Sequence, residues 1–425
     1  MKIICLTALL TVVADAAVSF GGEKKVLTWA HYHPELAKIF AQPCTPWQSE
    51  MVKTNFAASQ PTVVLGFKGE LIANAGSTLV HSTDGGRSWR VLCDVPVNDS
   101  VPKGYKLLAV NFDGCGVTEK GTILFQYTKQ YNDGRLYEGD KDETYHAESY
   151  FVRSTNRGQT WHSPVKLDPA PFNCVGTDRT RFVRLPGGVI GIALATWNQS
   201  RPGKMLPKSK WGFEAFLYTS SSDGRNWKRL GSLGRHTCEV DLLPLPTGRI
   251  LAAVRYQRKK LPRDPAELAS PYDMSKNIGA RSVYKQTALV HSDDGGRTWS
   301  KPRLTTGWLQ QTACLARLSD GTVVLPFGHK DEGFGQRFLM SFDEGRTWSR
   351  TVYQLRKGGL YANSVVLNDD TIITVHDNRK AGGGLSVLRW RTPSRETVSK
   401  GGFFKPQAIF VKAKVQSPQL SVSTP

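Results

Sequence analysis

Four side chains whose types could carry chemistry stand at the ends of strand-like runs. Glu239 heads one run, Arg255 closes the next, Arg337 leads into a turn motif, and Tyr361 begins the run that follows it. A carboxylate can take the proton of a phenol, which then becomes a nucleophile, and arginines hold carboxylates through paired, charge-assisted hydrogen bonds. Each of the four could instead serve packing or a surface ion pair.

A turn motif that recurs along the chain predicts the elements that must hold these side chains. In the pattern Ser-x-Asp-x-Gly-x-Thr-Trp, the Asp or Asn bonds backbone two residues on, the Gly adopts positive φ, and the Trp buries a large apolar face. Copies lie about 70 residues apart, and the last about 50, which is typical of repeat arrays. The full copies begin at Ser82, Ser154, Ser292 and Ser341, and a copy from Ser221 to Trp227 is shorter by one residue.

Between these turns, short apolar runs alternate with turn residues. Runs rich in β-branched residues, such as 188–195 and 248–255, have the length of strands, and no amphipathic helix longer than a few turns follows the first few dozen residues. Five marked units and an unmarked one from about Tyr361 to Arg391 predict an all-β fold, a six-bladed β-propeller over residues 53–400. A β-solenoid or a two-sheet sandwich is the alternative, but neither explains a packing Trp once per four strands.

The first residues have the composition of a secretory signal peptide. Met1-Lys2 precedes an apolar run over residues 3–13 and a small-x-small cleavage site ending at residue 16. We therefore expect residues 1–16 to be removed and the protein to be secreted, either periplasmic or extracellular; a retained signal anchor is the alternative. Residues 17–52 then lead into the propeller and residues 401–425 form a C-terminal tail. No run is long enough to span a bilayer.

Composition limits the partners and cofactors. Seven cysteines include Cys5 in the signal, so six remain, which permits disulfides but equally fits buried free thiols. No Cys-x-x-Cys or His-Glu-x-x-His spacing occurs, so neither a structural zinc nor any other cofactor is predicted. The formal charge of +20 comes without a basic run with interleaved aromatics, so we expect no nucleic-acid partner and favour an anionic ligand such as an acidic glycan.

The repeated motif resembles the Asp-box, or BNR repeat, of the sialidase (neuraminidase) superfamily. The resemblance runs from about Lys53 to Arg391 and includes segments 238–255, 337–343 and 361–373, which are similar to that family's catalytic strands. It implies that Tyr361 is the nucleophile, that Glu239 activates it, and that Arg255 and Arg337 hold the substrate. A neutral Tyr suits a sugar with a carboxylate on the anomeric carbon, because an ionised Asp or Glu would be repelled.

The function that this resemblance implies is an exported exo-glycosidase that removes sialic acid or a related acidic sugar from glycoconjugates. On this hypothesis the four residues should converge at one end of the central channel. The alternatives are a propeller that binds glycans without cleaving them and, less specifically, an interaction scaffold.

The chain departs from the family pattern in the first blade. The family is expected to place its first Arg and an acid/base Asp there, but residues 54–69 and 75–81 contain no Arg and no acidic residue. An acidic loop over residues 133–148 could supply the acid. Arg179, Arg181 and the cluster 376–379 could line the same opening. Without a substitute, hydrolysis of ordinary sialosides would be badly impaired.

Overall fold

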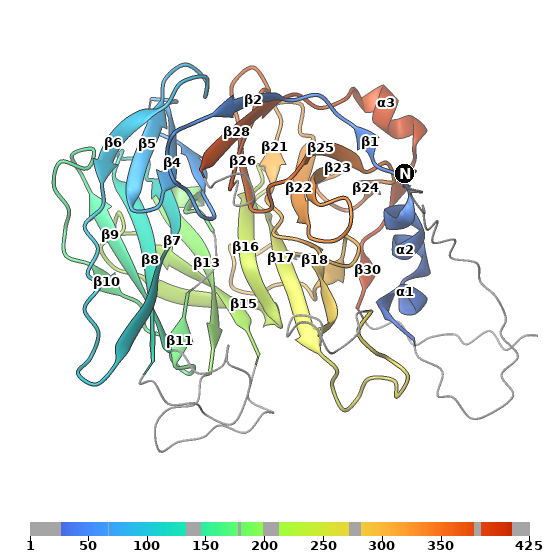
Figure 1. The fold of residues 1–425 in the computed structure, drawn as a ribbon, viewed down its shortest axis with the longest axis horizontal. Coiled ribbons are helices and arrows are strands. Elements are labelled where there is room, and N and C mark those ends of the chain that lie inside the picture. Colours follow the sequence, from blue (N-terminus) through green and yellow to red (C-terminus); the bar gives the residue numbers. More distant parts are fainter. Residues whose placement is uncertain are drawn as a thin grey trace, which may run out of the picture.

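The strands of the computed structural model form six sheets arranged around one axis (Figure 1), and this confirms the predicted six-bladed β-propeller. The structure describes residues 27–66, 68–132, 146–176, 180–198, 212–271, 282–377 and 384–409. Within each sheet neighbouring strands run antiparallel, except for one added strand of the fifth blade that pairs in parallel, and the first of the strands that follow one another in the chain lies nearest the axis. A four-stranded meander ends on the side where it began, so the innermost strands of successive blades run in the same direction.

The first three blades use strands that follow one another in the chain, with blade 3 splitting its innermost strand into two short pieces. Blade 1 contains β3 (Val63–Leu65), β4 (Leu71–Ala75), β5 (Thr78–Ser82) and β6 (Arg90–Asp94); blade 2 contains β7 (Lys106–Val117), β8 (Ile123–Asn132), β9 (His146–Ser154) and β10 (Val165–Lys166); blade 3 contains β11 (Cys174–Val175), β12 (Val183–Leu185), β13 (Val189–Trp197), β14 (Glu214–Ser220) and β15 (Lys228–Arg235). A 3-10 turn, η2 (Pro186–Gly188), links β12 to β13.

The last three blades each add a strand from a distant part of the chain. Blade 4 contains β16 (Thr237–Pro244), β17 (Ile250–Lys259), β18 (Ser282–Ser292), β19 (Arg303–Leu304) and β30 (Gln407–Ala408); blade 5 contains β20 (Gln310–Gln311), β21 (Ala316–Arg317), β22 (Val323–His329), β23 (Gly335–Ser341), β25 (Tyr353–Lys357) and β1 (Thr45–Pro46); blade 6 contains β26 (Ala362–Val366), β27 (Ile372–Asp377), β28 (Leu385–Trp390) and β2 (Glu50–Lys53). A separate ribbon pairs β24 (Trp348–Ser349) with β29 (Phe403–Phe404).

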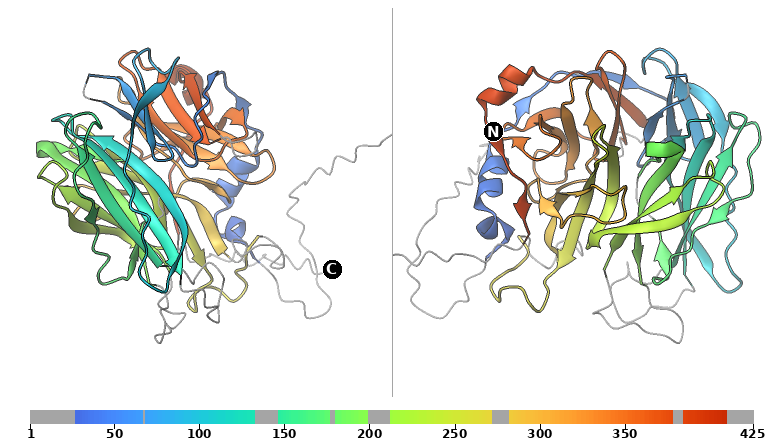
Figure 2. Two further views of the ribbon diagram at one scale, coloured as in Figure 1. Left: turned by 60° about the vertical axis from the view of Figure 1, so that its left-hand side comes forward. Right: turned by 180° about the vertical axis from the view of Figure 1, so that it is seen from behind.

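The segments on either side of residues 53–400 take part in the blades. Strand β2 lies beside β28 as the outer strand of blade 6 (Figure 1), while β1 and β30 extend blades 5 and 4. These added strands, two from before the propeller and one from after it, cover sheet edges that would otherwise be open. Helices α1 (Trp29–Tyr32) and α2 (Pro34–Ala41) lie outside the sheets beside β30, and α3 (Arg395–Lys400) follows the last blade (Figure 2).

Hydrogen bonds join neighbouring innermost strands all the way round the axis. The Val63 N–H donates to Asn363 Oδ1 (3.0 Å), the Cys115 N–H to Thr62 Oγ1 (3.2 Å), and the Phe182 N–H to the Cys115 carbonyl (3.2 Å). Asp241 Oδ2 accepts from Arg181 Nη2 (3.0 Å) and from the Leu315 N–H (2.7 Å), and Cys314 Sγ donates to Ser364 Oγ (3.3 Å). The ring is therefore closed, and side chains from distant blades reach a common centre.

The Asp-box turns lie after the third of the consecutive strands of a blade. In the last copy the Ser341 hydroxyl accepts from the Gly345 N–H (2.8 Å) and the Asp343 carboxylate accepts from the Thr347 N–H (2.8 Å). The Trp348 indole donates to the Gly345 carbonyl (3.0 Å). Gly345 adopts φ of +83°, which is the left-handed region that the motif's glycine is needed for.

The copy that was predicted to be one residue short is a full-length turn. Ser220 Oγ accepts from the Gly224 N–H (3.0 Å), and Ser222 Oγ accepts from the Asn226 N–H (2.9 Å). Ser222 therefore stands in the position of the Asp, and a serine at this position does not match the motif's Asp or Asn. Since a hydroxyl can accept the same backbone hydrogen bonds as a carboxylate, the turn keeps its shape.

Asp223, which was assigned to that turn, serves a neighbouring blade instead. Its carboxylate accepts from the hydroxyls of Thr118 (2.7 Å) and Thr122 (2.6 Å), which lie at the β7–β8 turn of blade 2. The residue thus ties blade 3 to blade 2.

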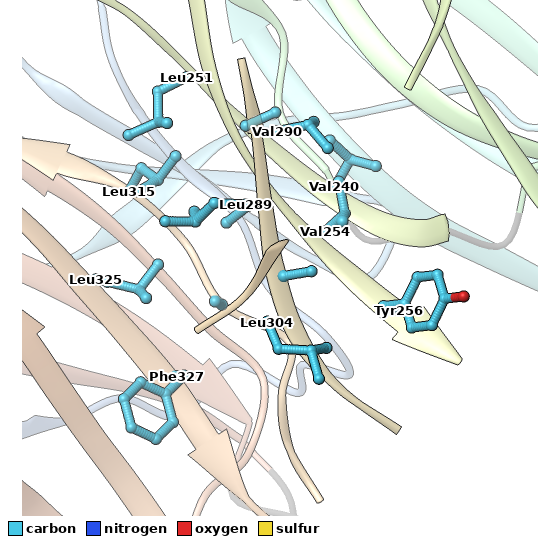
Figure 3. Close-up of a cluster of buried hydrophobic side chains, with 14 of the residues drawn as sticks. Val240, Leu251, Val254, Tyr256, Leu289, Val290, Leu304, Leu315, Leu325 and Phe327 are labelled. Atoms are coloured by element: carbon cyan, nitrogen blue, oxygen red, sulfur yellow. The ribbon is translucent and has the colours of Figure 1, made fainter. Parts of the chain in front are cut away.

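Apolar side chains fill the spaces between adjacent sheets. In the cluster drawn in Figure 3, Leu251 and Leu289 of blade 4 lie on the side of the sheet that faces Leu315 and Leu325 of blade 5, and all four are at most 5% exposed. Burying side chains of this size stabilises a fold by about 1.5–3 kcal/mol each. This packing between blades makes the axis a rigid support for polar groups.

Three other expectations concern the described residues. All six cysteines outside the signal segment are free thiols there. Within the same ranges no helix has the length and hydropathy to cross a bilayer, and no group of three or more His, Cys, Asp or Glu side chains is placed to hold a metal. The predicted signal peptide and most of the C-terminal tail lie outside the described residues.

Candidate functional site

Arg181 lies on the axis and connects four blades. It precedes β12 of blade 3; its Nη2 lies 3.0 Å from Asp241 Oδ2 of blade 4 and 2.7 Å from the Leu315 carbonyl of blade 5, while Nη1 donates to the Ser364 carbonyl of blade 6. Arg181 is 7% exposed and Asp241 is 3% exposed. A charge pair this deeply buried is tolerated because each partner compensates the lost hydration of the other.

The backbone around Arg181 explains how it reaches the axis. The N–H groups of its two neighbours, Thr180 and Phe182, donate to the carbonyls of Asp113 (3.2 Å) and Cys115 (3.2 Å) in β7. Alternating hydrogen bonds of this kind turn the side chain between them toward the centre. Arg181, which sequence reasoning considered only as a substitute for a missing arginine, is thus built into the ring.

Glu239 and Arg255 meet at the start of blade 4. Glu239 lies in a β-bulge of β16 with φ of +45°, and its Oε1 is 2.5 Å from Arg255 Nη1 in β17. Arg255 Nε also donates to Cys238 Sγ (3.1 Å). Arg255 lies opposite Cys238, not Glu239, in the pairing of β16 with β17. The bulge redirects the Glu239 side chain so that it still reaches Arg255. Both charged side chains are largely buried, so the pair is rigid.

A further cation lies close to this pair. Thr287 in β18 lies opposite Arg255, and Lys285 is two residues away from Thr287 on the same strand. The side chains of Lys285 and Arg255 are therefore on the same face of the sheet. Burial lowers the pKa of Lys285, and the positive charge of Arg255 lowers it further, while Glu239 acts in the opposite direction. We call the end of the central channel at which the innermost strands begin the mouth. Its wall at blade 4 thus carries the two cations Arg255 and Lys285 and the carboxylate of Glu239.

Tyr361 has a cation of its own, which sequence reasoning missed. Lys330 Nζ donates to Tyr361 Oη (3.3 Å) and lies 4.9 Å from the centroid of the same ring. Lys330 directly follows β22, and its backbone N–H is held by the Leu309 carbonyl (3.1 Å). The signal that singled out Arg255, a basic residue closing an apolar strand, also marks Lys330 at the end of β22.

The strand starts that carry Glu239 and Tyr361 face the same end of the channel. Glu239 stands two residues before Asp241, and Tyr361 stands three before Ser364, both of which Arg181 contacts. At about 3.3 Å per residue along parallel innermost strands, both lie above Arg181 on the same side. Among the described contacts no hydrogen bond joins Glu239 to Tyr361.

The side chain of Arg337 lies on the face of the blade 5 sheet that is turned away from Tyr361. Its Cα partner in β22 is Phe327, and cross-strand partners share a face. The next position of β22, Gly328, belongs to the other face, where a Cβ would lie 2.4 Å from the Leu360 carbonyl, the residue before Tyr361. The chain that carries Tyr361 therefore passes one face of the sheet while Arg337 occupies the other.

The surroundings of Arg337 are those of an interior position. Burial lowers its pKa, and the same face carries Cys44, whose thiol pKa is raised by burial. The expected convergence of Arg337 with Tyr361 is not found in this geometry, because alternate residues of a strand point to opposite faces and the prediction used only sequence distance from the Asp-box.

A cleft of about 720 Å³ opens on the opposite side of the mouth, at blades 6, 1 and 2. Its described lining includes the hydroxyl and amide side chains of Ser59, Gln60 and Asn111, the ring of Phe112, and the buried carboxylate of Asp113, whose Oδ2 lies 3.4 Å from Gln126 Nε2. None of the described lining residues is basic. This wall contains the first-blade segment in which the sequence lacks an arginine.

The substitutes suggested by the sequence have mixed outcomes. Arg179, most of the acidic loop and residues 378–379 lie outside the described residues. Glu148, at the end of that loop, accepts hydrogen bonds from Tyr150 Oη (2.7 Å) and Tyr131 Oη (3.0 Å) and pairs with Lys166 (2.5 Å). Its carboxylate is thus bound to side chains of blade 2. His376 is fully buried, and burial lowers its pKa to about 4, which keeps the ring neutral near pH 7.

Comparisons with known proteins agree with this architecture. Residues 290–301 match the family model described as BNR/Asp-box repeat. No curated protein matches the chain by sequence. Similar solved structures include a protein of unknown function from Dyadobacter fermentans, with a TM-score of 0.58 and 18% identity over 80% of this chain and 98% of that one.

Two sialidases are also similar. The Hadza microbial sialidase Hz136 has a TM-score of 0.56 and 16% identity over 80% of this chain and 66% of its own. The Trypanosoma rangeli sialidase in complex with the inhibitor DANA has a TM-score of 0.53 and 13% identity over 79% of this chain and 55% of its own. The chain therefore spans little more than half of the latter protein. It carries a BNR/Asp-box repeat on a propeller of sialidase type, and identities this low bear on the fold alone.

Proposed function

We propose that this protein is an exported sialidase-like glycoside hydrolase that acts on sialic acid or a related acidic sugar of glycoconjugates. The observation that supports the proposal is that Arg181 contacts both Asp241 and Ser364, which follow Glu239 and Tyr361 on two parallel innermost strands. A tyrosine beside a cation and a carboxylate beside an arginine are the groups that such a reaction needs.

In the proposed reaction Tyr361 attacks the anomeric carbon. Its phenol proton passes to Glu239, directly or through one water, the new O–C bond forms, and the bond to the leaving oxygen breaks as that oxygen takes a proton from water. In the second step water attacks the anomeric carbon and the O–C bond to Tyr361 breaks. Glu239 returns its proton to Tyr361 Oη, and the proton lost by the attacking water neutralises the hydroxide left by the first step. Arg255 keeps Glu239 in place (2.5 Å) and contributes positive charge for the sugar carboxylate. Arg337, behind the mouth, contributes to blade 5 rather than to the substrate.

Covalent trapping tests the proposal. Incubation with 2,3-difluorosialic acid, in which fluorine slows breakdown of the sugar–enzyme bond, should give an adduct that peptide mass spectrometry places on Tyr361. Tyr361→Phe should give none, whereas Tyr105→Phe, a control on the partly exposed Tyr105 of another blade, should be labelled like the wild type. Turnover of a 4-methylumbelliferyl sialoside should follow the same pattern. No adduct and no turnover in the wild type would refute the proposal.

One observation favours a second candidate, a propeller that binds glycans without cleaving them. The cleft wall at blades 6, 1 and 2 includes Ser59, Gln60 and Gly76 from residues 54–69 and 75–81, the two segments in which the resemblance implies an arginine and an acid and the sequence has neither. Such a protein would bind acidic glycans without turnover, and Arg255→Ala would abolish the binding. Export is part of both candidates, and mass spectrometry of the mature N-terminus from the native host tests it.

A further inference from the structure

The contact between Lys330 and Tyr361 has a specific chemical consequence. The ammonium donates to Tyr361 Oη over 3.3 Å while it also lies 4.9 Å from the ring centroid. Because an ammonium has donors and no acceptor, the phenol oxygen must accept in this contact, and its own hydrogen must point elsewhere. The hydroxyl hydrogen of Tyr361 therefore points away from Lys330.

The same cation favours the phenolate. An opposite charge within about 4–6 Å stabilises the charged form of an ionisable group, typically by about 1–3 pKa units. A Lys also supplies a point charge on a flexible stem, so it can follow the oxygen as charge develops.

Other charged groups of the described residues around Tyr361 have different contacts. Asp377 of β27 accepts from the backbone N–H of Tyr361 (3.4 Å), so its negative charge opposes the phenolate. Arg181 contacts the Ser364 carbonyl, three residues farther along β26, and Arg255 is engaged by Glu239. From the β22–β23 turn, Asp331 and Glu332 follow Lys330 in sequence and are exposed.

We propose that Lys330 is a positioning residue that orients the hydroxyl of Tyr361 and stabilises its phenolate. The proposal rests on the role of Tyr361 in the proposed function, but the electrostatic effect exists whether or not substrate is turned over. It therefore accounts for how a tyrosine in this mouth becomes a nucleophile.

The test is a direct titration of Tyr361. Protein labelled with ¹³C at the tyrosine ζ carbon is titrated by NMR from pH 7 to pH 11, and the Tyr361 signal is assigned by its loss in Tyr361→Phe. We expect the wild-type Tyr361 to ionise below the ordinary value of about 10. Lys330→Gln should raise its pKa by about one unit or more, while Lys330→Arg should keep it low. Lys301→Gln, which removes an exposed positive charge after β18, serves as the control.

An unchanged Tyr361 pKa in Lys330→Gln, relative to Lys301→Gln, would overturn the proposal. So would a Lys330→Arg variant that behaves like Lys330→Gln, because the charge would then not be the cause. If the titration gives the expected shift but no adduct forms with 2,3-difluorosialic acid, the proposed hydrolase function fails and the role of Lys330 stands. If Lys330→Gln does not fold, the wild-type and Lys330→Arg titrations decide, since a wild-type value at or above 10 contradicts the proposal.

Discussion

Arg181 Nη2 and Asp241 Oδ2 form a buried ion pair, 3.0 Å apart, at the point where blades 3 and 4 meet the axis. The same arginine donates to backbone carbonyls of blades 5 and 6. One side chain thus links four of the six blades just below the Glu239 and Tyr361 strand starts, so the geometry of the mouth depends on it.

Removing this arginine should destabilise the whole propeller. Arg181→Met leaves Asp241 buried without its countercharge, which costs about 3–5 kcal/mol in comparable pairs. Urea unfolding followed by tryptophan fluorescence measures the loss. Arg391→Met, which breaks an exposed pair with Asp369, is the control and should cost at most about 1 kcal/mol. Equal effects of the two substitutions would contradict the central role of Arg181.

The third Asp-box gives a prediction that separates two registers of one motif. If Ser220 and Ser222 make the turn, Ser220→Ala should destabilise the protein by about 1–2 kcal/mol through the lost bond to the Gly224 N–H. Ser221→Ala, at an exposed position, should change the free energy of unfolding by less than about 0.5 kcal/mol. Thermal unfolding of both variants measures the two effects. A larger loss of stability in Ser221→Ala than in Ser220→Ala would instead support the shortened motif that begins at Ser221.

Replacing Glu239 should impair chemistry more than binding. Glu239→Gln keeps the side-chain shape but cannot take a proton, so kcat with a 4-methylumbelliferyl sialoside should fall by about 10²–10⁴-fold with little change in KM. Glu396→Gln on the exposed helix α3 is the matched control and should have wild-type kinetics. A fall in kcat of less than tenfold would remove Glu239 from the proton-transfer step.

Stability should depend on pH through His376. Burial lowers its folded-state pKa to about 4 from the ordinary 6.5, so the unfolded chain binds more protons between these values. The contribution of the neutral His376 to the free energy of unfolding is therefore fully present above about pH 6.5 and is lost as the pH falls toward 4. Urea midpoints between pH 7 and pH 4 should fall less in His376→Gln than in the wild type. Parallel curves would show that His376 does not titrate as described.

The repeat motif allowed the blade count and the turn positions to be predicted, because each Asp-box turn is a local structure. The serine, the Asp and the glycine of one copy bond each other within a few residues, as Ser341, Asp343 and Gly345 do. The shifted third copy shows the limit: two candidate registers differ by one residue, and only the hydrogen bonds distinguish Ser222 from Asp223.

The site residues were predictable only in part. A strand-end position indicated Glu239 and Arg255, and the structure pairs them. Arg337 satisfied the same kind of rule but lies on the far face of its sheet, since a one-residue offset in a strand reverses the direction of the side chain. Lys330 went unnoticed, because its significance depends on Tyr361, 31 positions later in the chain.

The sequence by itself therefore determined the all-β class, the six repeating units and the polar groups at strand ends. Those properties arise from neighbours along the chain: alternation, turn chemistry and a packing tryptophan. Only the tertiary structure decided that β2 completes blade 6, that Arg181 ties four blades together, and that a lysine reaches the hydroxyl of Tyr361. These contacts join residues far apart in sequence, and they exist because the closed ring brings separate strand starts to one axis.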